Sequence, residues 1–122
     1  MLKSTAAGDV FVACHASIAA ATRPLCDVLI TGGGAVNFNG NDAIDLVCAG
    51  TTLDVFGRIG QDPGSAWMGG GLSTVDRTLR RQCTVTAGDP NGTDAFDPSV
   101  QWTGFPQNTF DGLGAHCPPP AP

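Results

Sequence analysis

The sequence of 122 residues contains no tyrosine, and charged residues make up only 14% of it. It has no apolar run long enough to cross a bilayer, and residues 1–8 lack the continuous apolar stretch of a signal peptide. A chain of this length has room for one domain, so a binding domain together with a catalytic domain is excluded. We therefore expect one domain with one function and no membrane partner.

Basic residues are scarce. Six lysine and arginine residues stand against eleven acidic residues, which gives a net charge of −5. A chain with this balance has no general attraction to a phosphate backbone or to anionic lipid. Direct binding of DNA would therefore need a local basic patch.

Glycine and proline are abundant, with 17 and 9 residues. They favour many turns over long helices and so predict a β protein. The clearest pattern is the alternation of apolar residues over 44–48 and again over 53–58, with Ala49-Gly50-Thr51 between the two runs. This pattern predicts a β-hairpin.

Further elements are expected on both sides of this hairpin. The β-branched and aromatic run Val10–Cys14 predicts a buried strand, and residues 18–22 predict a short helix that the following Arg-Pro pair ends. A strand is predicted over residues 78–85, and an apolar piece at 100–102 is expected to close a second sheet.

Two side chains need special accommodation in this arrangement. Arg81 falls on the inward face of its strand and requires a carboxylate or carbonyl partner, which the sequence does not identify. Trp67 lies in a turn-rich connection and is expected to fold back onto the sandwich edge, because so large a ring is costly to leave in water.

Five cysteines exceed ordinary cytosolic usage, and none belongs to a Cys-x-x-Cys pair. We therefore expect disulfides and an oxidising location, extracellular or periplasmic. The expected pairs are Cys14–Cys26, which bracket the short helix, and Cys48–Cys83, which lie late in two strands with inward phase. Cys117 is then left unpaired, and we expect its partner to lie outside this chain.

The motifs for catalysis are missing. His15 and His116 have no second histidine nearby, and the chain has no Gly-x-Ser-x-Gly elbow. The glycine run at 31–34 is not followed by the Lys-Ser or Lys-Thr of a phosphate loop. We expect no catalytic residue and no required cofactor.

Two groups of residues are candidates for binding. Oxygen-bearing side chains recur through an acidic loop at Asp89, Asn91, Asp94 and Asp97, as they do in calcium loops, although hydrogen-bonded Asx turns are the default explanation. A basic cluster could grip phosphate or carboxylate, although strand arginines more often pair with acids across a sheet. It consists of Arg77, Arg80 and Arg81, with Arg58 beside them.

An ordered series of short motifs covers most of residues 9–116. The motifs are Asn37-Phe38-Asn39-Gly40-Asn41-Asp42-Ala43, Leu53-Asp54-Val55-Phe56-Gly57, Asp62-Pro63-Gly64 with Trp67, Thr78-Leu79-Arg80-Arg81, Asp94-Ala95-Phe96-Asp97-Pro98 with Trp102, and Asp111-Gly112-Leu113-Gly114 with His116. In this order and spacing they resemble the second half of the lamin-tail-type domain of bacterial secreted nucleases.

The resemblance implies an all-β fold, an immunoglobulin-like sandwich that here lacks its first strands, with one short helix. It also implies a metal-dependent nuclease domain downstream as the partner, where the catalytic residues would lie. The missing strands would leave a sheet edge open to edge-strand dimerisation. We expect a disordered N-terminus at residues 1–8, the sandwich domain at 9–116 and a proline-rich linker at 117–122.

Three hypotheses follow for the function. The leading one is a non-catalytic accessory module that supports or positions a secreted nuclease. The alternative is a module that binds an extracellular polymer, DNA or glycan, through Arg80, Arg81 and an exposed Trp67. The third is a truncated gene product without independent function.

Overall fold

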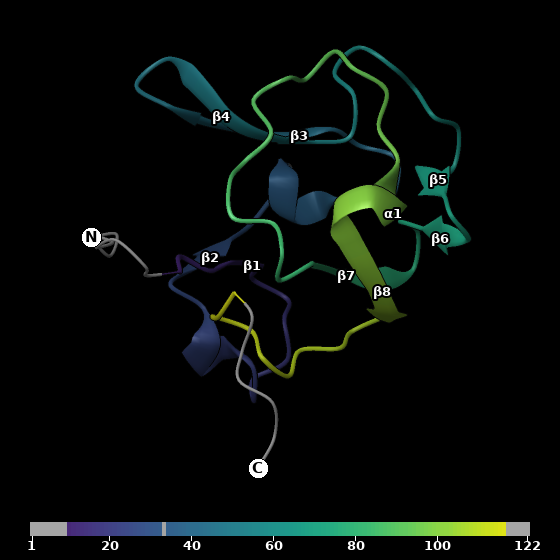
Figure 1. Ribbon diagram of the computed structural model, residues 1–122. Coiled ribbons are helices and arrows are strands. Elements are labelled where there is room, and N and C mark those ends of the chain that lie inside the picture. Colours follow the sequence, from purple (N-terminus) through teal and green to yellow (C-terminus); the bar gives the residue numbers. More distant parts are fainter. Residues whose placement is uncertain (1–9, 33, 117–122) are drawn as a thin grey trace. The chain divides into compact units, whose positions relative to one another are not determined.

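The computed structural model describes residues 10–32 and 34–116 (Figure 1). Over these residues the regular elements are mostly short strands, in four two-stranded sheets, with one short α-helix, and turns and loops connect them. The predicted all-β class is therefore confirmed. The expectations for residues 1–8 and 117–122 fall outside the described residues.

The chain divides into two compact units. Unit 1 consists of Met1–Asn37 and Phe110–Pro122, and unit 2 is the continuous segment Phe38–Thr109. The described segments before Phe38 and after Thr109 thus belong to one unit, and the middle of the chain forms the other. The prediction of a single domain over residues 9–116 stays a prediction.

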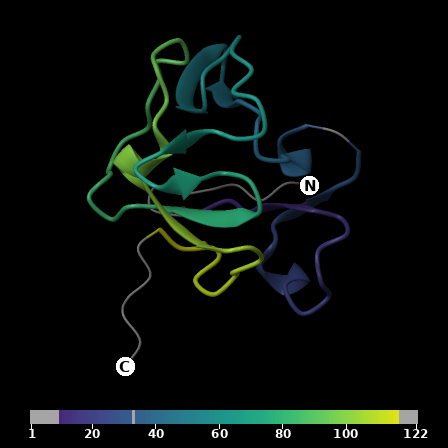
Figure 2. The same cartoon turned by 90° about the vertical axis from the view of Figure 1, so that its right-hand side faces the viewer.

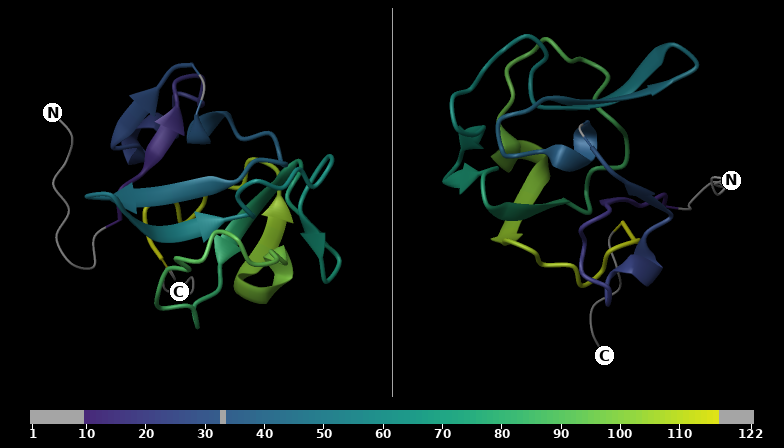
Figure 3. Two further views of the ribbon diagram at one scale, coloured as in Figure 1. Left: turned by 90° about the horizontal axis from the view of Figure 1, so that it is seen from above. Right: turned by 180° about the vertical axis from the view of Figure 1, so that it is seen from behind.

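Unit 1 contains a parallel strand pair, β1 (Ala13–His15) and β2 (Val28–Ile30), which run side by side in Figure 3 (left). The Cys14–Cys26 disulfide ties β1 to the segment just before β2, as predicted. The backbone N–H of Val12 donates to Asp27 Oδ2 at 2.7 Å. These two links reinforce the parallel pair, whose register covers three residues of each strand.

The expected strand and helix of this region are corrected by the structure. The strand begins at Ala13 and not at Val10, and residues 18–22 form turns. The helical turn is the 3₁₀ helix η1 (Arg23–Leu25), and a second one is η2 (Ala35–Asn37). Pro24 occupies the first turn of η1, where a missing N–H is harmless, so this proline starts a helical turn where we expected it to end one.

Unit 2 begins with the predicted hairpin, formed by β3 (Ile44–Cys48) and β4 (Thr51–Phe56). Its two-residue turn has positive φ at Ala49 (50°) and Gly50 (79°), the backbone that a type I′ turn requires. The register shifts between Leu46 and Val47, which marks a bulge. Figure 3 (right) shows the hairpin extending away from the remaining strands of unit 2.

The other long pairing in unit 2 joins β7 (Arg77–Arg81) to β8 (Trp102–Pro106) in antiparallel register (Figure 2). The helix α1 (Pro98–Gln101) leads directly into β8. A small hairpin of β5 (Met68–Gly69) and β6 (Leu72–Ser73) packs against both.

The strand expected at 100–102 is therefore displaced, because Val100 belongs to α1 and the strand begins at Trp102. The Asp97 side chain accepts a hydrogen bond from the Ser99 backbone N–H, and proline stands in the first turn, so the residues before Trp102 carry the start signals of a helix.

The core of unit 2 is an aromatic cluster centred on Phe56. Its ring centroid lies 5.7 Å from Phe38, 4.8 Å from Phe96 and 5.2 Å from Trp102. Trp67 joins the cluster through Phe96, at 5.7 Å. These rings bring together segments that are far apart in sequence, which replaces the longer strands that the chain lacks.

Trp67 is only 3% exposed, and its indole Nε1–H donates to the Asp42 carbonyl at 2.9 Å. Its backbone N–H donates to the buried Thr74 hydroxyl at 3.0 Å. The expectation that this ring folds inward is confirmed. Gly57, with φ of 86°, lies against the ring, because a Cβ there would be 3.0 Å from two Trp67 ring carbons and 3.1 Å from Ala43 Cα.

We predict that Gly57→Ala destabilises the protein by about 3 kcal/mol, since it adds overpacking against Trp67 to the strain of positive φ. Gly64→Ala is the matched control, because Gly64 has φ of 90° and nothing within 4 Å of its missing Cβ. It should lose only about 1 kcal/mol. Urea unfolding measures both values, and equal losses would contradict the close packing.

Candidate functional site

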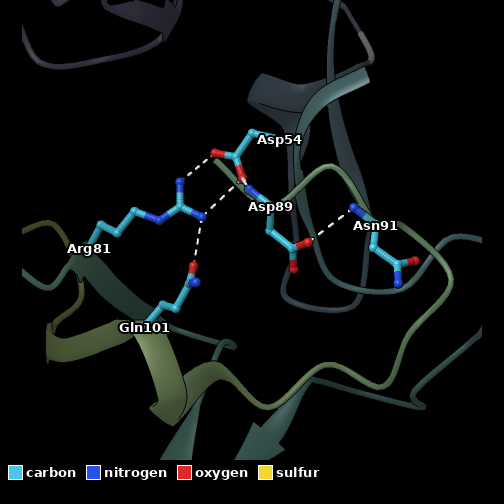
Figure 4. Close-up of polar contacts among 5 residues, drawn as sticks. All are labelled: Asp54, Arg81, Asp89, Asn91 and Gln101. Atoms are coloured by element: carbon cyan, nitrogen blue, oxygen red, sulfur yellow. Dashed lines mark hydrogen bonds and ion pairs between the residues drawn. The ribbon is translucent and has the colours of Figure 1, made fainter. Parts of the chain in front are cut away.

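The polar centre of unit 2 is formed by Arg81 and Asp54 (Figure 4). Both terminal nitrogens of the Arg81 guanidinium, Nη1 and Nη2, donate to the Asp54 carboxylate, with Nη2 2.9 Å from Oδ1. Nη2 also donates to Gln101 Oε1 at 2.8 Å. The backbone N–H of Asp89 donates to Asp54 Oδ1 at 2.8 Å. The inward-facing arginine therefore has the carboxylate partner that its strand phase requires.

The pairing with Arg81 affects the pKa of the Asp54 carboxyl. Burial would raise the pKa of its carboxyl, but the hydrogen bonds and charge of Arg81 and the backbone N–H of Asp89 and Val55 favour the charged form more strongly. The pKa of Asp54 consequently lies below its ordinary value of 3.8. Arg81 serves the fold in this arrangement and does not present its guanidinium to a ligand.

We expect Asp54→Asn to lower the free energy of unfolding at pH 7 by about 2 kcal/mol, less than the roughly 3–5 kcal/mol for breaking a fully buried pair, because both side chains are partly exposed. A lowered pKa stabilises the fold above pH 3.8 and loses that contribution as the pH falls through the folded pKa.

The variant should therefore lose less stability than the parent chain between pH 5 and pH 2, on the order of the same 2 kcal/mol. Asp45→Asn is the control, since Asp45 is exposed and accepts only a 3.3 Å bond from the Thr52 hydroxyl. Thermal melts across this pH range compare the three chains. Parallel acid profiles for the Asp54 variant and the parent would contradict the role of the ion pair.

The acidic loop that was a candidate calcium site is organised by local hydrogen bonds. Asp89 Oδ1 accepts from the Asn91 N–H at 3.0 Å, and Asn91 Oδ1 accepts from the Thr93 N–H at 3.1 Å. Asp97 caps α1, and the Ser99 bonds hold the pKa of its carboxyl below the usual range. Asp94 is exposed. Calcium binding by these residues stays a prediction.

The arginines of the predicted basic cluster have separate partners in the structure. The Arg80 guanidinium lies over the Phe105 ring, 4.5 Å from its centroid, and that of Arg81 lies 4.9 Å from the centroid of Trp102. Arg77 is exposed, and its Nη1 donates to the Asp76 carbonyl at 3.0 Å. With Trp67 buried, the predicted surface of Arg80, Arg81 and exposed Trp67 is wrong, because the ring belongs to the core and Arg81 is paired.

An open groove of about 690 Å³ runs along β8 instead. Two half-buried rings, Trp102 and Phe105, line it, together with the exposed Thr103 and Arg77 at the start of β7. The remaining lining residues come from the β5–β6 hairpin, α1 and the rest of β8: Gly70, Gly71, Leu72, Ser99, Gly104 and Pro106.

Gly104 of β8 lies against the Leu72 side chain of β6, and both residues line the groove. A Cβ at this position would lie 2.3 Å from Leu72 Cδ1, so a larger residue would displace that side chain. Our sequence reasoning missed the groove, although a glycine between Thr103 and Phe105 in an aromatic strand is a signal of close backbone approach. Of the predicted binding residues, only Arg77 lines it.

One of the two predicted disulfides, Cys48–Cys83, is not present in the structure. Cys48 is an exposed free thiol at the end of β3, so the predicted Cys48–Cys83 disulfide is wrong. Its side chain stands at the tip of the extended hairpin beside Leu46 and Val47, which are 59% and 53% exposed, and not in the inward phase that alternation predicted. Cys83 is disulfide-bonded, and Cys117 lies outside the described residues.

Iodoacetamide should therefore label Cys48 in the native, unreduced protein, and Cys14 and Cys26 only after reduction, since a thiolate and not a disulfide reacts. Peptide mapping by mass spectrometry identifies the labelled residue. Cys48→Ser serves as the control and should lose that label. Native labelling of Cys14 or Cys26 would refute the assignment.

Searches for relatives leave the resemblance untested: no protein-family model, curated protein or solved structure matches the chain. Within the described residues, no group of three or more His, Cys, Asp or Glu side chains is placed to hold a metal ion. The helices of that same part of the chain are too short and too polar to cross a membrane.

Proposed function

We propose that this chain is a non-catalytic module of a secreted protein and that it binds an extracellular polymer in the groove along β8. The observation that carries the proposal is the lining of the groove, where two aromatic rings, a hydroxyl and a guanidinium lie along one strand and its neighbour. Such a mixture of apolar walls and a few polar groups is typical of ligand sites.

The groove is supported by the rigid parts of unit 2. Trp102 packs edge-on against Phe56 in the core, and Arg80 covers one face of Phe105. Both rings are thus held in place before any ligand arrives, which lowers the entropy cost of binding. The groove is open to solvent, so a polymer does not have to be enclosed to reach it.

The polymer that fits best is a glycan. The rings of Trp102 and Phe105, which strand alternation places on opposite faces of β8, each offer a flat apolar surface for the C–H faces of sugars. Thr103 offers a hydroxyl on the same face as Phe105. DNA fits less well, because the net charge is −5 and the guanidinium groups of Arg80 and Arg81 already lie on rings or pair with an acid.

The motif resemblance supplies the context. We propose an immunoglobulin-like sandwich of lamin-tail type, carried by a secreted bacterial nuclease whose catalytic domain is a separate part of the protein. The Cys14–Cys26 disulfide agrees with an extracellular or periplasmic location. In this setting the module would hold the nuclease near a polymer-rich surface.

Affinity gel electrophoresis of the purified chain against a panel of neutral and acidic polysaccharides tests binding. We expect retardation by at least one glycan and at least a tenfold loss of affinity in Phe105→Ala, which removes one ring of the groove. Leu46→Ala, at an exposed hairpin position, is the control and should bind normally. Unchanged binding in a folded Phe105→Ala chain would exclude the groove as the site.

The same preparation should show no cleavage of DNA with magnesium or calcium, and robust cleavage would refute the non-catalytic role.

A further inference from the structure

The loop between β7 and α1 contains an asparagine that is followed by a glycine, Asn91-Gly92. The backbone nitrogen of the residue after an asparagine can attack the carboxamide carbon of that side chain and close a five-membered ring. Glycine favours this attack, because it has no side chain to shield its nitrogen and its backbone rotates freely. Asn91 is exposed and Gly92 is partly exposed, so water reaches the reacting atoms.

Local hydrogen bonds hold the Asn91 side chain in an arrangement that suits this ring closure. Its Oδ1 accepts from the Thr93 backbone N–H and from the Thr93 hydroxyl, each at 3.1 Å. This Asx turn closes a ring of atoms that includes the Gly92 nitrogen, so the carboxamide carbon is bent toward the atom that attacks it. The two donors also stabilise the negative charge that develops on Oδ1 during the attack.

We propose that Asn91 is a site of spontaneous deamidation and that Thr93 is its positioning residue. The Gly92 nitrogen forms a bond to Asn91 Cγ, the bond from Cγ to Nδ2 breaks, and Nδ2 leaves as ammonia with the proton of the Gly92 N–H. Water then opens the cyclic imide at one of its two carbonyl carbons. One opening leaves an aspartate at position 91, and the other leaves an isoaspartate, whose main chain runs through the side-chain carbon. The reaction needs only water and is independent of the groove and its ligand.

The other Asn-Gly pair of the sequence, Asn39-Gly40, allows a comparison within the same chain. Gly40 is buried, and its carbonyl accepts a hydrogen bond from the buried Thr74 hydroxyl. A Cβ at Gly40 would lie 2.8 Å from Val75 Cβ and 2.9 Å from Val75 Cα, so the two backbone segments are in close contact. Ring closure at Asn39 has to move this packed backbone.

The backbone at Gly92 is less restrained. A Cβ there would lie 2.6 Å from Ile59 Cδ1, which is the end of a flexible side chain that is 47% exposed. Ring closure at Asn91 therefore displaces a side chain that can rotate away. We expect the reaction at Asn39 to be about tenfold slower than at Asn91.

Deamidation would act on the attachment of this loop to β4. The Val55 N–H donates to the Asp89 carbonyl and the Ile59 N–H donates to the Gly92 carbonyl, both at 2.8 Å. An isoaspartate at position 91 adds one carbon to the main chain between these two bonds and so shifts one relative to the other. Both products also place a negative charge beside Asp89, whose Oδ1 accepts from the Asn91 N–H at 3.0 Å (Figure 4). The modified chain is therefore expected to be less stable.

The test incubates the purified full chain in neutral buffer and follows both Asn-Gly pairs over time by peptide mapping with mass spectrometry. The Asn91 peptide should convert about tenfold faster than the Asn39 peptide. Asn91→Gln should give no product, because its longer side chain would have to close a larger ring. Chains aged until Asn91 is converted should melt at a lower temperature than fresh chains, and the Asn91→Gln variant aged in parallel should not change.

Thr93→Val tests the positioning role, because it removes one of the two donors and keeps the shape of the side chain. It should slow conversion at Asn91 about fivefold. Thr52→Val is the matched control, since it removes a hydroxyl that bonds to Asp45 on the β3–β4 hairpin, and it should leave the rate unchanged. An unchanged or higher rate in Thr93→Val would overturn the role of Thr93.

Unfolding in guanidinium chloride separates the effect of the fold from that of the sequence. The rate at Asn39 should rise on unfolding, whereas the rate at Asn91 should stay the same or fall. Equal rates at the two pairs in the native chain, or faster conversion of Asn91 after unfolding, would overturn the proposal, because the folded loop would then protect Asn91 or have no effect on it.

Discussion

The ion pair between Arg81 and Asp54 is the constraint on which unit 2 depends. It joins β7 to β4, and through Gln101 and the Asp89 backbone it also fixes the end of α1 and the acidic loop. None of these segments shares a long sheet with another, since each sheet has two strands over the described residues. A charged hydrogen-bond network thus performs the joining that a broad sheet performs in larger β proteins.

The ion pair and the groove are connected through Gln101 and Trp102. Gln101 precedes Trp102, and the Arg81 guanidinium lies over the Trp102 ring, so the same arginine that satisfies Asp54 also orients one wall of the groove. The core ring Phe56 supports Trp102 from another side. Trp102 is therefore held by partly buried interactions with neighbouring elements.

Sequence reasoning succeeded where the signal was local. The alternation over residues 44–48 and the turn at Ala49-Gly50 predicted the β3–β4 hairpin, and strand phase predicted that Arg81 needs a partner. It could not identify Asp54, because that pairing spans 27 residues and depends on how β4 and β7 approach each other. The groove could not be predicted from the sequence for the same reason, since its lining residues come from separate elements.

Two predictions were wrong because the rule behind each of them allows more than one structure. A proline beside a helical segment can mark the end of one helix or the first turn of the next, and both η1 and α1 have a proline in their first turn. Strand phase assigned Cys48 an inward side chain, but alternation has meaning only where a second layer covers the strand. At the tip of the extended hairpin nothing of that kind is described, and Leu46, Val47 and Cys48 are all exposed.

The arrangement of the two units has a consequence for the order in which the chain matures. Unit 2 is one continuous segment, so it is synthesised before any residue from Phe110 onward. Unit 1 also includes the segment that begins at Phe110, which is synthesised after all of unit 2. Its Cys14–Cys26 bridge closes a short loop near the start and can form early, so oxidation would hold the first half of unit 1 until translation delivers the second.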